Sequence, residues 1–371
     1  MRILHTADWH IGRTLSGFDL LPTQQASFAA LRQVAHDQNV DAIIIAGDLY
    51  DRGLAAENAV NAVNGMMRTL NRDDGFPLLV ISGNHDSAPR LATGSEWYSS
   101  TGFYLHTRLE EAFTPVTIGD TQFFLLPYFE PAMARNYFDD DQLTNIGTAM
   151  VPVIAKMVAA FAPDKKHVLV AHFFAAGSTH TGSETPVNVG GLDAVPLDVL
   201  EPFDYVALGH LHNRHAVNAD KIQYAGSLVK FDVSETEQRK GVYVLDTETM
   251  ERQFVEIPQS PDFINVQGSF EHVMDPDFYH TIDTDSFAQV TLTDTEIIPD
   301  LMSQLRTVYQ RCTGVDRTHG VATLVTEKPV DRHLDPMDLL GQFYDDTNGV
   351  TMTDEQRQWA ADALAHVEGQ E

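Results

Sequence analysis

The chain has 371 residues, too many for one average domain, and its hydrophobic content of 43% is enough for sizeable cores. Its longest apolar runs, such as residues 42–46, reach only the length of a strand, so we expect no membrane-spanning segment. The N-terminus lacks the apolar stretch of a signal peptide, and the single cysteine, Cys312, excludes intramolecular disulfides and thiolate metal clusters. We therefore expect a cytoplasmic protein without membrane contact.

The charge of the chain is strongly acidic. It has 24 Lys and Arg against 53 Asp and Glu, which gives a formal net charge of −29. Duplex DNA is itself densely negative. Taken alone, this balance argues against a protein that binds nucleic acid unaided, so the charge bears directly on which partner to expect.

Over roughly the first 250 residues, short apolar runs alternate with helical periodicity, the pattern of a layered α/β domain. Strands are expected over residues 2–7, 41–46, 77–82, 121–126, 167–171, 205–208, 222–225 and 241–246. Helices are expected over residues 23–38, 55–70 and 150–161. Polar and titratable side chains recur where strands end, which is the edge at which α/β sheets usually build their sites.

Pro258, Ser260 and Pro261 indicate a linker after this domain. Beyond the linker, strands are expected over residues 263–270, 287–293 and 321–326, and helices over residues 271–279 and 297–312. From residue 335 onward the pattern is helical. We therefore predict a large α/β domain over residues 1–257, a small α/β module over residues 262–330 and a helical tail over residues 331–371.

Five short motifs follow the strands in order, and each places a His, Asp or Asn within a residue or two of a strand end. They are Asp8-Trp9-His10, Gly47-Asp48-Leu49-Tyr50-Asp51-Arg52-Gly53, Gly83-Asn84-His85-Asp86, His172 and Gly209-His210-Leu211-His212. Each motif alone is more often a turn, a helix cap or a core histidine. Five of them at successive strand ends are not explained by chance, and they predict one shared site.

The motif set resembles the calcineurin-like metallophosphoesterase superfamily. Within it, residues 8–12, 207–212 and 225–227 look like the SbcD family, the nuclease subunits of bacterial SbcCD exonucleases. The resemblance covers essentially the whole chain and is strongest over residues 1–250. It implies an α/β fold in which helices flank a layered β-sandwich core, followed by a small α/β capping domain and a C-terminal helical tail.

The resemblance also implies two divalent metal ions held by seven residues. One ion would be held by Asp8, His10 and His212, the other by Asn84, His172 and His210, and Asp48 would bridge both. Two metals can shield the anionic phosphate and generate a hydroxide near neutral pH. Imidazole, carboxylate and amide ligands without thiolate suit Mn²⁺, Fe²⁺ or Zn²⁺ better than Mg²⁺ or Ca²⁺, and the resemblance favours Mn²⁺.

Three further residues of these motifs have expected roles. His85 would protonate the leaving oxygen or hydrogen-bond the transition state. Asp51 would orient His85 through its carboxylate, although archaeal relatives carry a histidine near this position, so Asp51 is a departure from their pattern. Arg52 would bind substrate phosphate, as the arginine of the similar motif does in Ser/Thr protein phosphatases; the alternative is an ordinary surface arginine.

The function implied is that of a DNA exonuclease and endonuclease in DNA repair, recombination and replication. The resemblance implies ATP-dependent cleavage of double strands and cleavage of single strands, with an SbcC-type SMC-like ATPase as partner and a homodimer within a heterotetramer. One alternative is a phosphoesterase of the same superfamily acting on a phosphoprotein or small nucleotide, but the extension beyond residue 257 disfavours it. Another is a non-catalytic scaffold, which the seven filled ligand positions disfavour.

The tail has the pattern of two amphipathic helices. Asp335 and Pro336 favour a helix start, and residues 353–356 have the sequence of a capping box for a second helix. The apolar positions are Met337, Leu339, Leu340, Phe343 and Tyr344 in the first helix, and Trp359, Ala360, Ala363, Leu364 and Val367 in the second. These faces either fold back on the preceding module or dock into the ATPase partner, and the resemblance favours docking.

Overall fold

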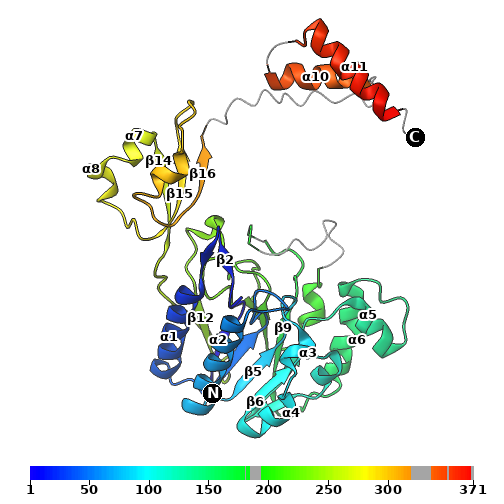
Figure 1. Ribbon diagram of the computed structural model, residues 1–371. Helices are drawn as coiled ribbons and strands as arrows, with labels where there is room; N and C mark the ends of the chain where they lie inside the picture. Colours follow the sequence, from blue (N-terminus) through cyan, green and yellow to red (C-terminus); the bar gives the residue numbers. More distant parts are fainter. Residues whose placement is uncertain (180, 184–193, 319–335, 349–350, 369–371) are drawn as a thin grey trace.

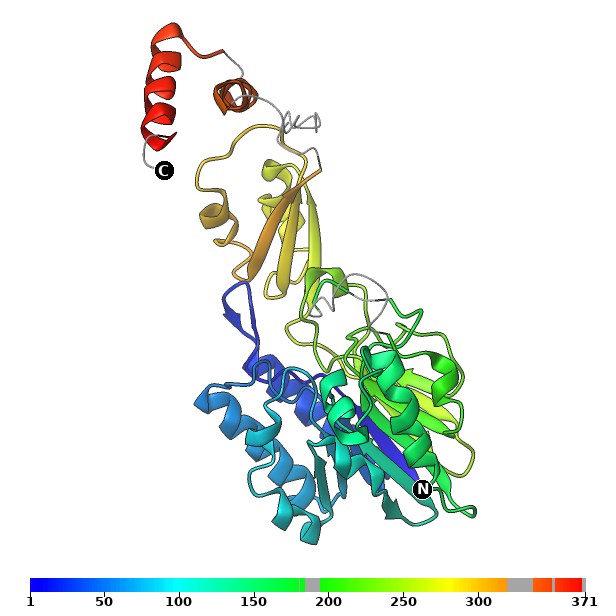
Figure 2. The same cartoon turned by 90° about the vertical axis from the view of Figure 1, so that its right-hand side faces the viewer.

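The computed structural model describes residues 1–368 except residue 180 and residues 184–193, 319–335 and 349–350. Its largest body contains two β-sheets with helices on their outer sides, as Figures 1 and 2 show. A separate three-stranded sheet and a pair of C-terminal helices follow along the chain (Figure 1). None of the described helices is both long enough and apolar enough to cross a membrane.

The first sheet has six strands in the order β13-β12-β1-β4-β5-β6. Their bounds are Arg252–Glu256 (β13), Gly241–Asp246 (β12), Arg2–Thr6 (β1), Ala42–Ala46 (β4), Leu78–Ile81 (β5) and Phe103–His106 (β6). Strands β1, β4, β5 and β6 run parallel, and β12 pairs antiparallel with β1. Every residue of β4 and β5 is buried, as expected for parallel strands that are covered on both faces.

The second sheet has five strands in the order β11-β10-β9-β8-β7. Their bounds are Ile222–Tyr224 (β11), Tyr205–Gly209 (β10), Lys166–His172 (β9), Thr121–Leu126 (β8) and Val116–Ile118 (β7). All are parallel except β7. Strands β6, β7 and β13 were not predicted from the sequence, whereas the eight strands predicted for this domain are present with shifts of a residue or so at their ends.

The two sheets face each other across a dry core. Ile44 and Leu79 from the first sheet pack in one buried cluster with Phe123 and Val168 from the second. The outer face of the first sheet is covered by α1 (Leu21–Asp37) and α2 (Glu57–Arg68), and that of the second by α6 (Ile146–Val158). Helix α5 (Pro131–Phe138) lies beside α6. This is the expected layered sandwich, and it brings the carboxyl ends of both sets of parallel strands to one edge.

The small α/β module is built on the parallel sheet β14-β15-β16, with bounds Phe263–Gly268, Phe287–Leu292 and Cys312–Arg317. Two expectations for it need correction. The predicted helix over residues 271–279 is two short helices, α7 (Phe270–Val273) and α8 (Pro276–Tyr279), because Pro276 cannot continue a helix. The predicted helix over residues 297–312 is only α9 (Leu301–Leu305), since residues from Cys312 onward enter the sheet.

The third strand of this module was expected over residues 321–326, which lie outside the described residues; the described third strand is β16. The module contacts the large two-sheet body through the hairpin of β2 (Thr14–Leu15) and β3 (Phe18–Asp19). The ring of Phe18 meets that of Phe287 edge to face with centroids 6.0 Å apart, and the Arg306 guanidinium lies 5.7 Å from the Phe18 centroid.

The tail forms two helices, α10 (Pro336–Asn348) and α11 (Asp354–Glu368), which contact each other. The predicted capping box is present: Thr353 N donates to Gln356 Oε1 at 2.9 Å, and Gln356 N donates to Thr353 Oγ1 at 3.3 Å. Asp335, the predicted cap of the first helix, lies outside the described residues. Phe343 and Trp359 are 67% and 63% exposed, and the pair stands apart from the other described parts in both views (Figures 1 and 2).

Candidate metal centre

The predicted ligands lie together at the edge that the two sheets share. Asp8 N donates to Gly47 O at 3.1 Å, which holds the loops after β1 and β4 side by side. The second sheet joins them where His172 Nδ1 lies 2.9 Å from Ala46 O. The cluster formed in this way contains all seven predicted ligands: Asp8, His10, Asp48, Asn84, His172, His210 and His212.

The first group consists of Asp8, His10 and His212, whose donor atoms lie within 4.8 Å of one another. All three residues are buried. His10 Nε2 and His212 Nε2 are 3.1 Å apart. Two imidazole nitrogens that face each other at this distance converge on a position where one cation can bind both lone pairs.

The second group consists of Asn84, His172 and His210. Asn84 Oδ1 lies 2.9 Å from His172 Nε2 and 2.9 Å from His210 Nδ1. The other nitrogen of His172 faces the carbonyl of Ala46, which can only accept, so Nδ1 carries the proton and Nε2 is directed into the site. The second group therefore presents two ring nitrogens and one amide oxygen to a common point.

Asp48 lies between the two groups. Its Oδ2 is 3.5 Å from His10 Nε2 in the first group and 3.3 Å from His172 Nε2 in the second. Its Oδ1 accepts from the backbone N–H of His85 at 2.9 Å, which fixes the orientation of the carboxylate. A carboxylate held in this way has one oxygen within reach of both groups.

Four of the predicted ligands have a left-handed backbone, which residues other than glycine rarely adopt. Their φ angles are 53° at Asp8, 43° at His10, 52° at Asp48 and 97° at His210. Conformations of this kind cost about 1–3 kcal/mol each and persist only where the surrounding structure holds them. Their concentration at this edge indicates a functional site.

Charge and burial also favour a cation here. Asp8 and Asp48 are 0% and 1% exposed, and buried carboxylates require a positive partner. Burial lowers the pKa of His210 to about 3. Burial has the same effect on His172, yet the carboxylates of Asp48 and Asp8 outweigh it and raise the pKa of His172 to about 9. The site therefore attracts positive charge into its centre.

The donor set fits divalent metal ions. It combines imidazole nitrogens, two carboxylates and an amide oxygen, and it includes no thiolate, since Cys312 lies in the small module. His10 Nδ1 is buried and makes no hydrogen bond to any described residue. Neither of the two groups of donors includes a Lys or Arg side chain.

His85 occupies the entrance to the centre, with its ring edge-on to that of His10 at 4.7 Å between centroids. Its Nδ1 donates to the backbone oxygen of Asp51 at 2.8 Å. Asp51 thus contacts His85, but this hydrogen bond uses the carbonyl of Asp51, where its carboxylate was expected. The carboxylate of Asp51 lies 3.8 Å from Arg13 Nε and 3.4 Å from Arg52 Nε.

Several residues that support the site were not predicted. Asp86 accepts hydrogen bonds from the backbone N–H groups of Gly83 at 2.9 Å and Tyr50 at 3.0 Å, so it joins the loops after β4 and β5. Its position at the end of the Gly83-Asn84-His85-Asp86 motif is the sequence feature that could have identified Asp86 as a supporting residue. Arg13, with its guanidinium 4.8 Å from the Phe231 ring centroid, had no such signal.

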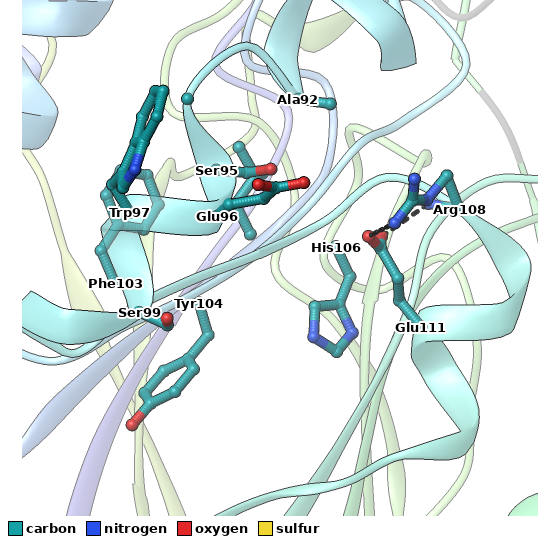
Figure 3. Close-up of a pocket in the computed structure, with 12 residues that line it drawn as sticks. Ala92, Ser95, Glu96, Trp97, Ser99, Phe103, Tyr104, His106, Arg108 and Glu111 are labelled. Carbon is teal, nitrogen blue, oxygen red and sulfur yellow. Dashed lines mark hydrogen bonds and ion pairs between the residues drawn. The ribbon is translucent and has the colours of Figure 1, made fainter.

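A separate cavity of about 340 Å³ lies beside the edge strand β6. Figure 3 shows His106 next to the pair formed by Arg108 and Glu111, in which Nη2 of Arg108 lies 2.8 Å from Oε1 of Glu111. None of the predicted site residues lines the cavity. The sequence motifs thus converge on the metal centre and leave this cavity without an assigned role.

Both the large body and the small module are similar to known families. Residues 1–214 match the family described as Calcineurin-like phosphoesterase, and residues 260–348 match the Type 5 capsule protein repressor C-terminal domain. The SbcD subunit of the nuclease SbcCD from Staphylococcus epidermidis is 32% identical over 83% of this chain and 83% of its own length. The protein of the same name from Staphylococcus saprophyticus is 29% identical over 96% of both chains.

Among solved structures, a dimetal phosphatase from Danio rerio aligns with 70% of this chain and 99% of its own, at 12% identity and a TM-score of 0.42.

The contact between Gly83 and Asp48 leads to a first prediction. A Cβ at position 83 would overlap Asp48 Oδ1 and would lie 2.5 Å from Asp48 N, so Gly83→Ala must displace the central carboxylate. We expect this variant to lose divalent metal binding, measured by metal analysis of the purified protein and by titration calorimetry.

The matched control is Gly65→Ala in α2, where an added Cβ meets nothing within 4 Å. It should retain metal and gain about 0.5–1 kcal/mol of stability, because alanine is the better helix former. Unchanged metal affinity in Gly83→Ala would contradict the central position assigned to Asp48.

Proposed function

The chain belongs to the calcineurin-like phosphoesterase family, and we propose that it is the metal-dependent nuclease subunit of an SbcCD-type complex, which hydrolyses phosphodiester bonds of DNA. The observation that carries the proposal is the position of Asp48 Oδ2, 3.5 Å from His10 Nε2 and 3.3 Å from His172 Nε2. A carboxylate between two groups of donors is what a phosphoesterase with two metal ions requires. Similarity to the nuclease subunits over most of the chain supports DNA as the substrate.

We assign one metal position to Asp8, His10 and His212 and the other to Asn84, His172 and His210, with Asp48 shared. Mn²⁺ is the proposed ion, with Fe²⁺ and Zn²⁺ as the alternatives, because the donors mix imidazole with oxygen ligands. When bound, two such ions neutralise the phosphate and activate a water near neutral pH. The remaining steps belong to side chains of this chain.

His85 is proposed as the general acid. Its Nδ1–H bond to Asp51 O holds the ring, and Nε2 is the nitrogen proposed to protonate the leaving oxygen. A carbonyl acceptor suits both the neutral ring and the ring protonated on both nitrogens, so proton transfer from Nε2 does not disturb this contact. Arg52, with a side chain 80% exposed beside Asp51, is the proposed contact to a substrate phosphate.

The proposed function is tested by a nuclease assay across Mn²⁺, Mg²⁺ and Zn²⁺, with and without the ATPase partner. We expect the chain alone to cleave single-stranded DNA with Mn²⁺, and the complex to degrade double-stranded ends with ATP. Asp48→Ala should abolish both activities and lose metal from both positions, since Asp48 is shared. Activity on a phosphopeptide or nucleotide but not on DNA would favour a phosphatase, and full activity in Asp48→Ala would contradict the site assignment.

A second variant separates proton transfer from metal binding. His85→Ala should lower turnover by about 10²–10⁴-fold, the usual contribution of a general acid. Metal content and DNA affinity should stay unchanged, because the proposed role concerns only the barrier. Single-turnover cleavage and metal analysis measure the two effects.

The control for this variant is His280→Ala, an exposed histidine of the small module, which should change neither quantity. Loss of metal from His85→Ala would instead make His85 a ligand.

The acidic charge of the chain fits a division of labour with the partner. The formal charge of −29 disfavours extended contact with DNA, so much of the DNA-binding surface is proposed to belong to the ATPase. Helices α10 and α11 are proposed to dock on that ATPase, and the exposed aromatic rings of Phe343 and Trp359 are suited to a partner groove. We further propose a homodimer within a heterotetramer.

The three sequence units, residues 1–257, 262–330 and 331–371, are proposed as nuclease domain, capping domain and partner-binding tail. Because the proposed substrate is chromosomal DNA, we infer a cytoplasmic location.

Truncation after Pro329 tests the docking role. The shortened chain should stay folded and cleave short single strands with Mn²⁺, but it should not co-purify with the ATPase. The double substitution Phe343→Asp with Trp359→Asp should have the same effect without a deletion. Ile297→Asp is the control, since Ile297 is an exposed residue of the small module and 83% of its surface is accessible. Undiminished complex formation by the truncated chain would exclude the docking role.

A further inference from the structure

Behind His212, on the side of the ring away from His10, lies a buried chain of polar side chains. His212 Nδ1 is 2.5 Å from Ser183 Oγ, and Ser183 Oγ in turn hydrogen-bonds Glu235 Oε1. The second oxygen of this carboxylate, Glu235 Oε2, is 2.6 Å from Lys240 Nζ. These contacts form a relay, Ser183–Glu235–Lys240, that starts at a proposed metal ligand and ends at a buried ammonium.

The relay is well enclosed and is attached to His212 twice. Glu235 is 0% exposed, Lys240 is 3% exposed and Ser183 is 7% exposed. Lys240 Nζ also donates to the backbone oxygen of His212 at 2.9 Å. The same three residues therefore contact both the ring and the main chain of His212.

The chemistry of the donors fixes the direction of every proton in the relay. Lys240 can only donate, and an ionised Glu235 can only accept. Ser183 must then donate its single hydroxyl proton to Glu235, so its two lone pairs remain for Thr181 Oγ1, which donates to it at 2.8 Å, and for His212 Nδ1. It follows that Nδ1 of His212 carries a proton and donates it to Ser183. The Nε2 atom, 3.1 Å from His10 Nε2, is left as the nitrogen with the lone pair.

We propose that Ser183, Glu235 and Lys240 are positioning residues that hold His212 in the one tautomer able to bind the first metal ion. The inference rests on the proposed metal-dependent function and deepens it. Carboxylates that accept from the distant nitrogen of a metal-bound histidine set its orientation and raise its basicity. Here the carboxylate acts through a serine, because Glu235 Oε1 itself is 3.7 Å from His212 Nδ1.

A single isosteric substitution at Glu235 can reverse the direction of the hydrogen bond between Ser183 and His212 Nδ1. In Glu235→Gln the amide NH₂ is repelled by Lys240, so the amide oxygen turns to Lys240 and the NH₂ turns to Ser183. Ser183 then accepts from the amide and donates its own proton to His212 Nδ1. The ring is driven into the opposite tautomer, with the proton on Nε2, where it opposes metal binding.

A second change should restore the direction. In the double variant Glu235→Gln with Lys240→Met the ammonium is gone, so the amide oxygen is able to face Ser183 again. Replacing a buried ion pair by neutral side chains of similar size is commonly well tolerated. The double variant therefore restores the acceptor that the relay needs, and its thermal unfolding measures the effect of losing the hydrogen bond from Lys240 Nζ to His212 O.

The experiment measures Mn²⁺ affinity and stoichiometry by electron paramagnetic resonance of free Mn²⁺, together with thermal unfolding of the metal-free chain. We expect two ions in the wild type. In Glu235→Gln one of them should bind about 10–100-fold more weakly, the usual effect of losing such a supporting contact. The double variant should recover most of that loss.

The matched control is Lys230→Met. Lys230 is another buried lysine, 5% exposed, with its Nζ 2.7 Å from Asp262 Oδ1, but that pair touches no predicted ligand. It should lower the unfolding temperature and leave both Mn²⁺ affinities unchanged.

Two unchanged Mn²⁺ affinities in Glu235→Gln, with a fall in unfolding temperature like that of Lys230→Met, would reduce the pair to a stability role and overturn the proposal. A double variant that binds no better than Glu235→Gln would overturn it too, because proton direction would then not be the cause. Failure of the wild-type chain to bind Mn²⁺ would instead contradict the proposed function itself, so the two failures are distinguishable.

Discussion

Two carboxylates, Asp8 and Asp48, are enclosed where the carboxyl edges of two parallel sheets meet, and their charge has to be balanced inside the protein. That requirement accounts for much of what surrounds them. It explains why ring nitrogens of His10 and His172 lie within 3.5 Å of one Asp48 oxygen, and why glycine occupies position 83, where any Cβ would meet that carboxylate. The left-handed backbone at four ligands is the steric consequence of turning the chain sharply enough to bring them together.

The sequence was sufficient for the sandwich and for the ligands because both depend on local patterns. Buried strands such as β4 are continuous apolar runs, and each ligand follows such a run within a few residues. Prediction failed where tertiary context decides. The edge strand β6 has only four residues, and it is defined by its pairing with β5. Residues 297–312 have helical spacing, but pairing with β15 draws Cys312 into a strand.

The support around the ligands was the least predictable part of the site. Asp51 was identified by its proximity in the motif, yet only the structure shows that its carbonyl accepts the hydrogen bond from His85 Nδ1. Glu235 and Lys240 stand in an ordinary-looking polar segment, with no motif to distinguish them from surface charges. They are buried because the loop that contains them folds against His212, and the spacing of residues along the sequence does not predict that contact. Supporting residues are therefore found by geometry, whereas the ligands themselves are found by sequence.

The β2–β3 hairpin has a mechanical consequence. It continues directly from the loop of His10, and Phe18, the first residue after its turn, contacts Phe287 and Arg306 of the small module. A rotation of the small module must either break this aromatic contact or displace the hairpin. A displacement of the hairpin moves the backbone of His10, because the two are joined by a short stretch of chain. The positions of the first group of ligands, Asp8, His10 and His212, thus depend on the orientation of the small module, which contributes no ligand.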